Sequence, residues 1–367
     1  MTGAGRVGVG VIGAGVISTQ YLDNLTTFPD VEVLFIADLD VSRAREQADK
    51  YGIAGSGTTA ELLAHPDIEI VVNLTIPAAH VAVALEALEA GKNVWTEKPI
   101  ALDRESGAAL LAEAARRGLR VATAPDTFLG VGLQTGKRLI ESGRIGTPLT
   151  GLVQFQVSGP EAWHPNPDFL YAVGAGPLFD MGPYYITALV QNFGPVARVV
   201  ATSSTSRATR IIASGPRQGQ EFPVEVPTHI SALIEFESGA SAQVVFSFQS
   251  QLRRAGVLEI SGTDATLVFP DPNTFAGDLL LWSEGAETPE TISTVSDTGR
   301  GTGVVDLARA IRADVPERAS GELAFHVLDV MVSISEAASR GEFVTVDSTV
   351  ALAESLPESW DPRESTL

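Results

Sequence analysis

The chain contains no cysteine among its 367 residues. This absence excludes disulfide bonds, a thiol nucleophile and cysteine-ligated zinc, and it fits a reducing compartment. We therefore expect a cytoplasmic protein. Cations are also scarce, because 25 Lys and Arg stand against 45 Asp and Glu, for a net charge of −20. Such acidity disfavours nucleic acid and anionic membranes as partners.

Four further features are missing from the sequence. No run approaches the roughly 20 apolar residues that a membrane helix needs. No His, Asp and Glu cluster has metal-ligand spacing, so we expect no metal, and no Ser, His and Asp set indicates a hydrolase triad. Arg6 is the only charged residue before the apolar stretch at residues 7–12, and that stretch has no cleavage-type ending. The stretch predicts a first strand and not a signal peptide.

The most informative motif is residues 13–18, which read GAGVIS and lie between an apolar run, residues 7–12, and a helical pattern. Gly13 turns the chain sharply. Gly15 would let a pyrophosphate approach the backbone, and Ser18 is small enough for the helix to pack on the strand. The free N–H groups at the start of that helix would face an anion.

A second predicted strand, residues 31–37, ends in Asp38, about where an acid meets the adenosine ribose of a dinucleotide. A carboxylate there accepts hydrogen bonds from the 2′-hydroxyl and repels a 2′-phosphate. Leu39 follows, and we expect Arg43 and Arg45 on a helix surface. The sequence therefore favours NAD over NADP. The alternative is that Asp38 is only a strand-end turn residue.

Strands and helices alternate up to residue 125, which predicts an NAD-binding domain over residues 1–125. Further strands are expected at residues 68–74, 93–96 and 119–122, and helices at residues 42–51, 60–64, 79–90 and 102–118. The fold class we expect here is α/β, a Rossmann doubly wound parallel sheet.

Residues 126–367 predict a second, α+β domain for substrate binding and oligomerisation, with a largely antiparallel open sheet covered by helices on one face. Strands are expected at residues 149–157, 197–203, 231–236, 240–249, 257–261 and 266–269, and helices at residues 132–142, 178–192, 304–312 and 321–340. Residues 237–239 and 262–264 predict hairpin turns, and residues 204–227 and 283–302 surface loops. We expect a homodimer or homotetramer formed through this sheet.

Residues 96–99 read TEKP and follow a predicted strand. Pro99 ends the strand and constrains Lys98 to an extended backbone. An ammonium at the carboxyl end of such a sheet could hydrogen-bond a substrate hydroxyl and stabilise the alkoxide as hydride leaves. The alternative is a solvated strand-end lysine.

Several motifs together resemble the glucose–fructose oxidoreductase and inositol dehydrogenase family (Gfo/Idh/MocA). The resemblance covers the whole chain. It is carried by residues 13–18, Asp38, residues 75–80 (TIPAAH), 97–99 (EKP), 174–184 (GAGPLFDMGPY) and 318–323 (RASGEL), and by His326. It implies NAD-dependent hydride transfer, with Lys98 and Asp180 beside the reacting carbon and Tyr184 where the family has a histidine.

Tyr184 departs from the family pattern. It lies one helical turn after Asp180, on the same face. With an ordinary pKa near 10 it is a poor base unless Lys98 lowers that pKa. Three interpretations stay open: Tyr184 transfers the proton, it positions substrate while Lys98 transfers the proton, or it only packs.

The expected site residues fall into two sets. For the cofactor they are Gly13, Gly15, Val16, Ile17, Asp38, Thr75, Ile76, Pro77, His80, Glu97 and Lys98. For the substrate they are Lys98, Asp126, Phe128, Trp163, His164, Asp180, Tyr184 and His229. His80 either lies near the nicotinamide ribose or is a polar residue at a helix start. His164 and His229 are the candidates to replace the missing histidine.

We therefore expect an oxidoreductase acting on a secondary hydroxyl of a sugar, sugar derivative or cyclic polyol. Two other functions stay open. Relatives of this family can use bound NAD for transient oxidation and elimination, and so hydrolyse glycosides. Others bind the dinucleotide as regulators without chemistry, although the presence of Lys98 argues against that.

Overall fold

The structure is a computed structural model that describes residues 5–296 and 298–367. Residues 1–4 of the predicted first domain and residue 297 of a predicted loop lie outside the described residues. The described residues form three sheets and divide into two compact units. The first unit comprises the described parts of Met1–Gly130, Ser296–Leu328 and Leu352–Leu367, and the second comprises Val131–Val295 and Asp329–Ala351. The predicted boundary between residues 125 and 126 stays a prediction.

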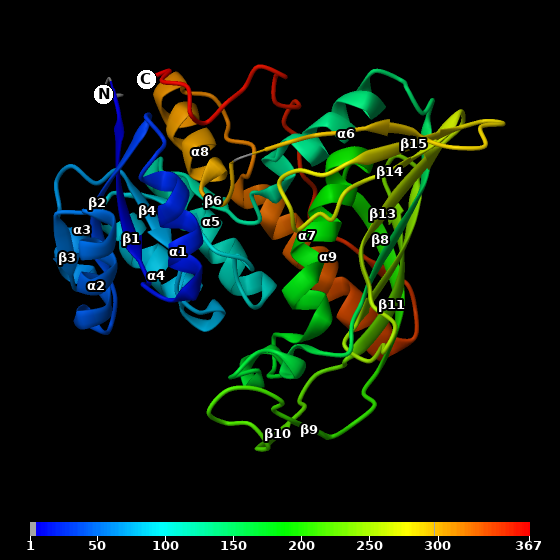
Figure 1. Cartoon of the computed structure of the whole chain (residues 1–367), viewed down its shortest axis with the longest axis horizontal. Helices are drawn as coiled ribbons and strands as arrows, with labels where there is room; N and C mark the ends of the chain where they lie inside the picture. The colour runs from blue at the N-terminus through cyan, green and yellow to red at the C-terminus, as the bar shows by residue number, and fades with distance from the viewer. Residues whose placement is uncertain (1–4, 297) are drawn as a thin grey trace. The chain divides into compact units, whose positions relative to one another are not determined.

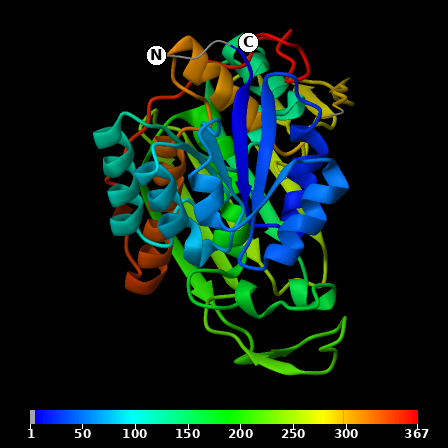
Figure 2. The ribbon, with the colours of Figure 1, turned by 90° about the vertical axis from the view of Figure 1, so that its left-hand side faces the viewer.

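The first unit is built on a six-stranded parallel sheet with the order β3-β2-β1-β4-β5-β6. Its strands are β1 Val7–Ile12, β2 Val31–Ala37, β3 Gly55–Gly57, β4 Ile70–Asn73, β5 Asn93–Thr96 and β6 Val121–Thr123. Its helices include α1 Val16–Leu25, α2 Val41–Tyr51, α3 Thr59–Leu63, α4 His80–Glu89, α5 Arg104–Arg117 and α8 Thr302–Ala313. Figure 2 shows α5 (cyan) on one side of this sheet and α1 and α2 (blue) on the other. The predicted doubly wound sheet is confirmed.

The second unit is built on a nine-stranded, mostly antiparallel sheet with the order β16-β15-β14-β13-β7-β12-β11-β8-β17. Its strands are β7 Pro148–Gln156, β8 Val196–Ser204, β11 His229–Phe236, β12 Ser241–Ser247, β13 Arg254–Gly262, β14 Ala265–Val268, β15 Leu279–Ser283, β16 Glu290–Ile292 and β17 Val344–Thr345. The pair β7 and β12 is parallel, and the two predicted hairpins join β11 to β12 and β13 to β14.

The helices of the second unit pack on one face of this sheet. They are α6 Val131–Glu141, α7 Gly176–Phe193 and the later part of α9 Gly321–Arg340. Alternate residues of β11 from Ile230 to Phe236 are buried, and ring contacts join α7 to β7 and β12. Figure 1 shows α7 beside the sheet, and the described residues of the second unit place no helix on the other face of that sheet. The predicted coverage of one face is therefore confirmed.

The predicted surface loop over residues 204–227 is wrong. It contains a two-stranded sheet, β9 Thr209–Ile211 paired with β10 Glu221–Pro223. Ile212 and Phe222 are buried against Tyr171 and Phe248 in a small hydrophobic cluster. The predicted loop over residues 283–302 likewise contains β16. These strands are only three residues long, too short for an alternating pattern to identify.

Candidate functional site

The turn after β1 contains two glycines, Gly13 and Gly15, and only Gly15 has open space beside it. Gly13 has a φ of +104°, and a Cβ there would lie 2.7 Å from the carbonyl oxygen of Leu74. Only glycine fits this position. A Cβ built on Gly15 meets nothing within 4 Å. The backbone at Gly15 is therefore open to an approaching group.

The N-terminus of α1 follows this turn directly. No side chain caps the helix there, and its first turn carries no acidic residue. Ser18 is fully buried and donates a 2.6 Å hydrogen bond to the carbonyl of Gly15. An uncapped helix start with no nearby carboxylate on its own first turn suits an anion. These features fit the pyrophosphate of a dinucleotide.

Asp38 follows β2 at the same edge of the sheet. Its Oδ2 accepts a 2.7 Å hydrogen bond from the backbone N–H of Ala14, which ties it to the glycine turn. Its Oδ1 accepts from the backbone N–H of Asp40 at 2.9 Å and from Arg43 at 3.0 Å. Arg43 lies on α2, where a helix-surface residue is expected. It is half exposed, and it forms an ion pair with Asp38.

Large apolar side chains are exposed at three neighbouring strand ends. Val16, Leu39 and Ile76 follow β1, β2 and β4 and are 90%, 102% and 69% exposed. Since these strands are adjacent in the sheet, the three side chains share one edge. Exposed apolar groups gathered at one place mark a binding surface. Leu39 had not been assigned to the site, because a single apolar residue after an acid gives no sequence signal.

Asn73, at the end of β4, shapes the next loop. Its Oδ1 accepts hydrogen bonds from the backbone N–H and the hydroxyl of Thr75, and its Nδ2 donates to the carbonyl of His80. His80 is buried, with Nδ1 2.8 Å from the carbonyl of Pro99 and Nε2 3.0 Å from that of Thr75. Burial lowers the pKa of His80. The ring therefore links the loop after β4 to the residue after Lys98.

Glu97 and Lys98 follow β5. Glu97 is buried and accepts hydrogen bonds from the hydroxyl of Tyr21 at 2.7 Å and from the backbone N–H of Lys98 at 3.2 Å. Trp95 donates to the Tyr21 hydroxyl, and burial raises the pKa of Tyr21 well above its ordinary value. This network fixes the backbone at Lys98, whose side chain is half-buried. Lys98 thus lies at the same sheet edge as Gly15 and Asp38.

Asp126 and Phe128, expected to contact substrate, are both buried. The Oδ2 of Asp126 accepts from the backbone N–H groups of Gly301 and Gly303 at the start of α8, and its Oδ1 lies 3.6 Å from Arg300. Burial raises the pKa of Asp126. These contacts attach α8 to the rest of the first unit. A substrate contact of either residue stays a prediction.

Asp180 and Tyr184 both lie on α7 of the second unit. They are one turn apart, as the sequence predicted, so they share a helix face. Asp180 is half-buried and Tyr184 is buried. Lys98 belongs to the first unit, and the roles of Asp180 and Tyr184 beside it stay predictions.

Three aromatic rings lie in contact in the chain segment before α7. The His164 ring lies 5.5 Å from that of Trp163 and 5.4 Å from that of Phe169, with both contacts edge-to-face. Trp163 and Phe169 are 67% and 53% exposed. Trp163, His164 and Phe169 therefore form a partly exposed aromatic surface, and the contact of Trp163 and His164 with a substrate stays a prediction.

His229 begins β11, and its Nε2 lies 3.1 Å from the hydroxyl of Ser231. Ile230 lies between these two residues, so its side chain points to the opposite face of the sheet. The cross-strand neighbour of Ile230 is Phe246, which contacts Tyr185 of α7. His229 therefore lies on the sheet face opposite α7, and burial lowers its pKa.

No helix in the part of the chain that the structure describes is long and apolar enough to span a membrane. Among the same residues, no group of three or more histidine, aspartate and glutamate side chains could hold a metal ion.

Two sequence matches cover most of the chain. Residues 7–124 match an oxidoreductase family with an NAD-binding Rossmann fold, described as GFO_IDH_MocA, and residues 133–268 match the GFO/IDH/MocA C-terminal domain. The chain belongs to the Gfo/Idh/MocA oxidoreductase family. Its first unit is therefore an NAD(P)-binding Rossmann domain of that family, and the predicted membership is confirmed.

Curated relatives within the family are distant. An uncharacterized oxidoreductase, ORF334, of Rhizobium meliloti is 28% identical over 92% of this chain and 98% of its own length. Trans-1,2-dihydrobenzene-1,2-diol dehydrogenase of Bos taurus is 26% identical over 76% and 79%. Inositol 2-dehydrogenase 3 of Saccharopolyspora erythraea is 31% identical over 43% and 48%.

Solved structures share the fold at low sequence identity. An NAD-binding oxidoreductase from Klebsiella pneumoniae has a TM-score of 0.82 at 22% identity and covers 93% of this chain and 99% of its own. Levoglucosan dehydrogenase with NADH and L-sorbose has a TM-score of 0.81 at 22% identity and covers 94% and 100%.

Proposed function

We propose that this protein is an NAD-preferring dehydrogenase that oxidises or reduces a secondary hydroxyl of a sugar, sugar derivative or cyclic polyol. The observation that carries the proposal is the shared sheet edge where Gly15, Asp38 and Lys98 follow β1, β2 and β5. Ligands of open α/β sheets bind at such carboxyl edges. The relatives' names, which include diol and inositol dehydrogenases, support the substrate class.

The residues of this edge fit a dinucleotide in several respects. The open backbone at Gly15 and the uncapped start of α1 suit a pyrophosphate, and Asp38 suits the adenosine ribose. Val16, Leu39 and Ile76 offer apolar surface for the rings. When bound, the nicotinamide supplies the hydride acceptor or donor. The proposal includes further cofactor contacts. They are expected from Ile17, Thr75, Pro77, His80 and Glu97, and some of these residues would act through the hydrogen bonds that hold the loops.

Lys98 would bind the reacting hydroxyl and take or return its proton. Its backbone is fixed by Glu97, and a positioned acid or base of this kind contributes about 10²–10⁴-fold to rate. Asp180 would orient the hydroxyl, with Tyr184 donating a hydrogen bond to the substrate. Trp163 and His164 would form a wall against sugar C–H groups. We further propose that two or four copies associate through the sheet face opposite α7, where Leu233 and Trp282 are exposed.

Purified protein incubated with NAD and a panel of sugars and inositols tests this function. Net NADH formation, followed by absorbance, supports the dehydrogenase. Glycoside turnover without net NADH would indicate redox-assisted hydrolysis instead. Dinucleotide binding without turnover of any panel member would favour a regulator.

A further inference from the structure

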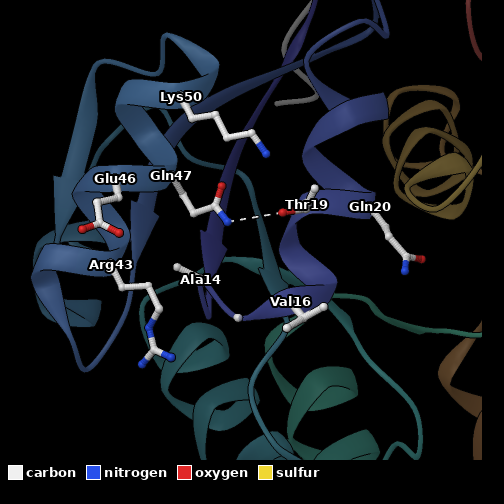
Figure 3. A pocket seen from close by; sticks show the side chains of 9 residues that line it. Ala14, Val16, Thr19, Gln20, Arg43, Glu46, Gln47 and Lys50 are labelled. Atoms are coloured by element: carbon white, nitrogen blue, oxygen red, sulfur yellow. Dashed lines mark hydrogen bonds between the residues drawn. The ribbon is translucent and has the colours of Figure 1, made fainter. Parts of the chain in front are cut away.

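A pocket of about 680 Å³ lies between α1 and α2. Figure 3 shows Ala14, Val16 and Arg43 at one end of it and Lys50 at the other. Its volume is within the range of small-ligand sites. Because Gly15 also lines it, the pocket adjoins the edge where the adenosine half of a dinucleotide is proposed to bind.

The carboxylate of Asp38 is not an isolated negative charge at this edge. The guanidinium of Arg43 lies 3.0 Å from its Oδ1, and two backbone N–H groups, of Ala14 and Asp40, also donate to it. An acid repels a 2′-phosphate through its charge, and a cation at contact distance offsets much of that repulsion. The usual rejection of NADP by such an acid is therefore weakened here.

The exposure of the two partners differs. The side chain of Asp38 is 10% exposed, whereas that of Arg43 is 50% exposed. The guanidinium is therefore the more exposed of the two charged groups, and Arg43 lines the pocket. A guanidinium has five N–H donors in a planar fork that matches phosphate oxygens. Arg43 can thus pair with Asp38 and still offer donors to an anion.

We propose that Arg43 is a specificity-determining residue through which this chain binds the 2′-phosphorylated dinucleotide NADP in addition to NAD. This inference rests on the proposed dinucleotide function. NAD remains the preferred cofactor, since Asp38 keeps lone pairs for the ribose hydroxyls. Arg43 sets how large that preference is.

The surrounding charges explain why the preference does not reverse. Asp40 caps α2 by accepting from the backbone N–H groups of Ser42 and Arg43, so its carboxylate lies at that helix start. Glu46, one turn after Arg43, also lines the pocket. Both acids oppose a phosphate. Lys50 lies two turns away, at the other end of the pocket (Figure 3).

Fluorescence titrations of NADH and NADPH test the inference in the full-length protein and in Arg43→Ala. We expect the unmodified protein to bind both, NADH more tightly. In Arg43→Ala the NADPH dissociation constant should rise about tenfold or more, the usual effect of losing a charge-assisted hydrogen bond. The NADH constant should stay within about threefold. Arg43→Lys should retain part of the NADPH affinity, because a point charge remains.

Arg45→Ala is the matched control. Arg45 lies on the same helix, is 77% exposed and pairs only loosely with Asp49, at 4.0 Å. Its loss should leave both titrations unchanged, which separates contact with the phosphate from a change in net charge.

Three outcomes would overturn the inference. One is NADPH binding that Arg43→Ala leaves unchanged, and another is an equal loss of both cofactors in that variant. The third is an unmodified protein that binds NADH and not NADPH, which would leave the proposed function standing. Failure to bind either cofactor would instead refute the proposed function itself, and the inference with it.

Discussion

The two edges of the six-stranded parallel sheet are built differently. At the amino edge, Asp30 and Glu69 directly precede β2 and β4, and each pairs with an arginine of α8, Arg309 at 2.8 Å and Arg312 at 2.6 Å. At the carboxyl edge, the residues that follow the strands include Gly13, Asp38, exposed apolar side chains and Lys98. Ion pairs tie the amino edge to the sequence-distant helix α8, whereas at the carboxyl edge Asp38 pairs with the nearby Arg43.

The difference follows from what each edge can bind. The pairs at the amino edge join segments that are far apart in sequence, including the C-terminal residues that reach Asp30. At the carboxyl edge the strand ends and the start of α1 offer backbone groups to a ligand, and the ion pair of Asp38 with Arg43 joins residues that are close in the sequence. We therefore expect substitutions at the amino edge to lower the stability of the fold. Substitutions at the carboxyl edge should instead change catalysis or cofactor binding.

The largest expected effect is at the carboxyl edge. Lys98→Ala should lower kcat by about 100-fold or more, because it removes the proposed proton-transfer group. Folding and NADH affinity should be nearly intact. Steady-state kinetics, NADH titration and thermal unfolding measure the three quantities. Near-normal turnover would remove Lys98 from the mechanism.

Asp30→Ala should have the largest effect at the amino edge. It leaves the half-buried Arg309 guanidinium without its carboxylate and the backbone N–H groups of Thr366 and Leu367 without an acceptor. We expect a loss of about 3 kcal/mol in the free energy of unfolding. Denaturant unfolding measures it. Glu32→Ala is the matched control, since its exposed pair with Arg6 should contribute less than about 1 kcal/mol.

The Asp30 effect should depend on pH. Burial opposes ionisation of Asp30, but hydrogen bonds from Thr366, Arg309 and Leu367 outweigh it and lower the pKa below its ordinary value of 3.8. The charge therefore stabilises the fold above that value, and this contribution is lost as the pH falls through the lowered pKa. The difference in the free energy of unfolding between the unmodified protein and Asp30→Ala should narrow only in acid.

The same variant also tests whether the two edges have separate roles. If folded Asp30→Ala had a kcat far below that of the unmodified protein, the amino edge would not affect stability alone.

Asp38→Ala should weaken NADH binding by about tenfold and narrow the gap between NADH and NADPH. The change removes the proposed ribose acceptor and the repulsion of a 2′-phosphate, and it frees Arg43 from its ion pair. Paired fluorescence titrations measure both constants. An unchanged ratio of the two would mean that the acid does not contact the ribose.

The smallest expected effect is in the second unit. Tyr184→Phe deletes one hydroxyl and should raise KM while kcat stays within about tenfold, as expected when ground-state and transition-state binding are lost together. Michaelis–Menten kinetics separate the two parameters. A loss in kcat as large as that of Lys98→Ala would make Tyr184 the proton-transfer group. A variant like the unmodified protein in both parameters would leave His164 or His229 as the next residue to substitute.

The sequence by itself determined the elements whose signals are local. The strands at residues 7–12, 31–37 and 93–96 have the predicted bounds, because each is a short, largely buried apolar run ended by a turn or an acid. The glycine turn and Asp38 could also be predicted, since their geometry depends on a few consecutive residues. Residues 321–340 gave a helix with the predicted bounds.

Only the tertiary structure decided the rest. The hairpin within residues 204–227 forms because Phe222 packs on Tyr171, far away in the sequence. The face on which His229 lies depends on β-sheet register, and the pairing of Arg43 depends on how α2 packs beside β2. Which side chains meet from two different helices or strands depends on how these elements pack. Local sequence propensity does not predict it.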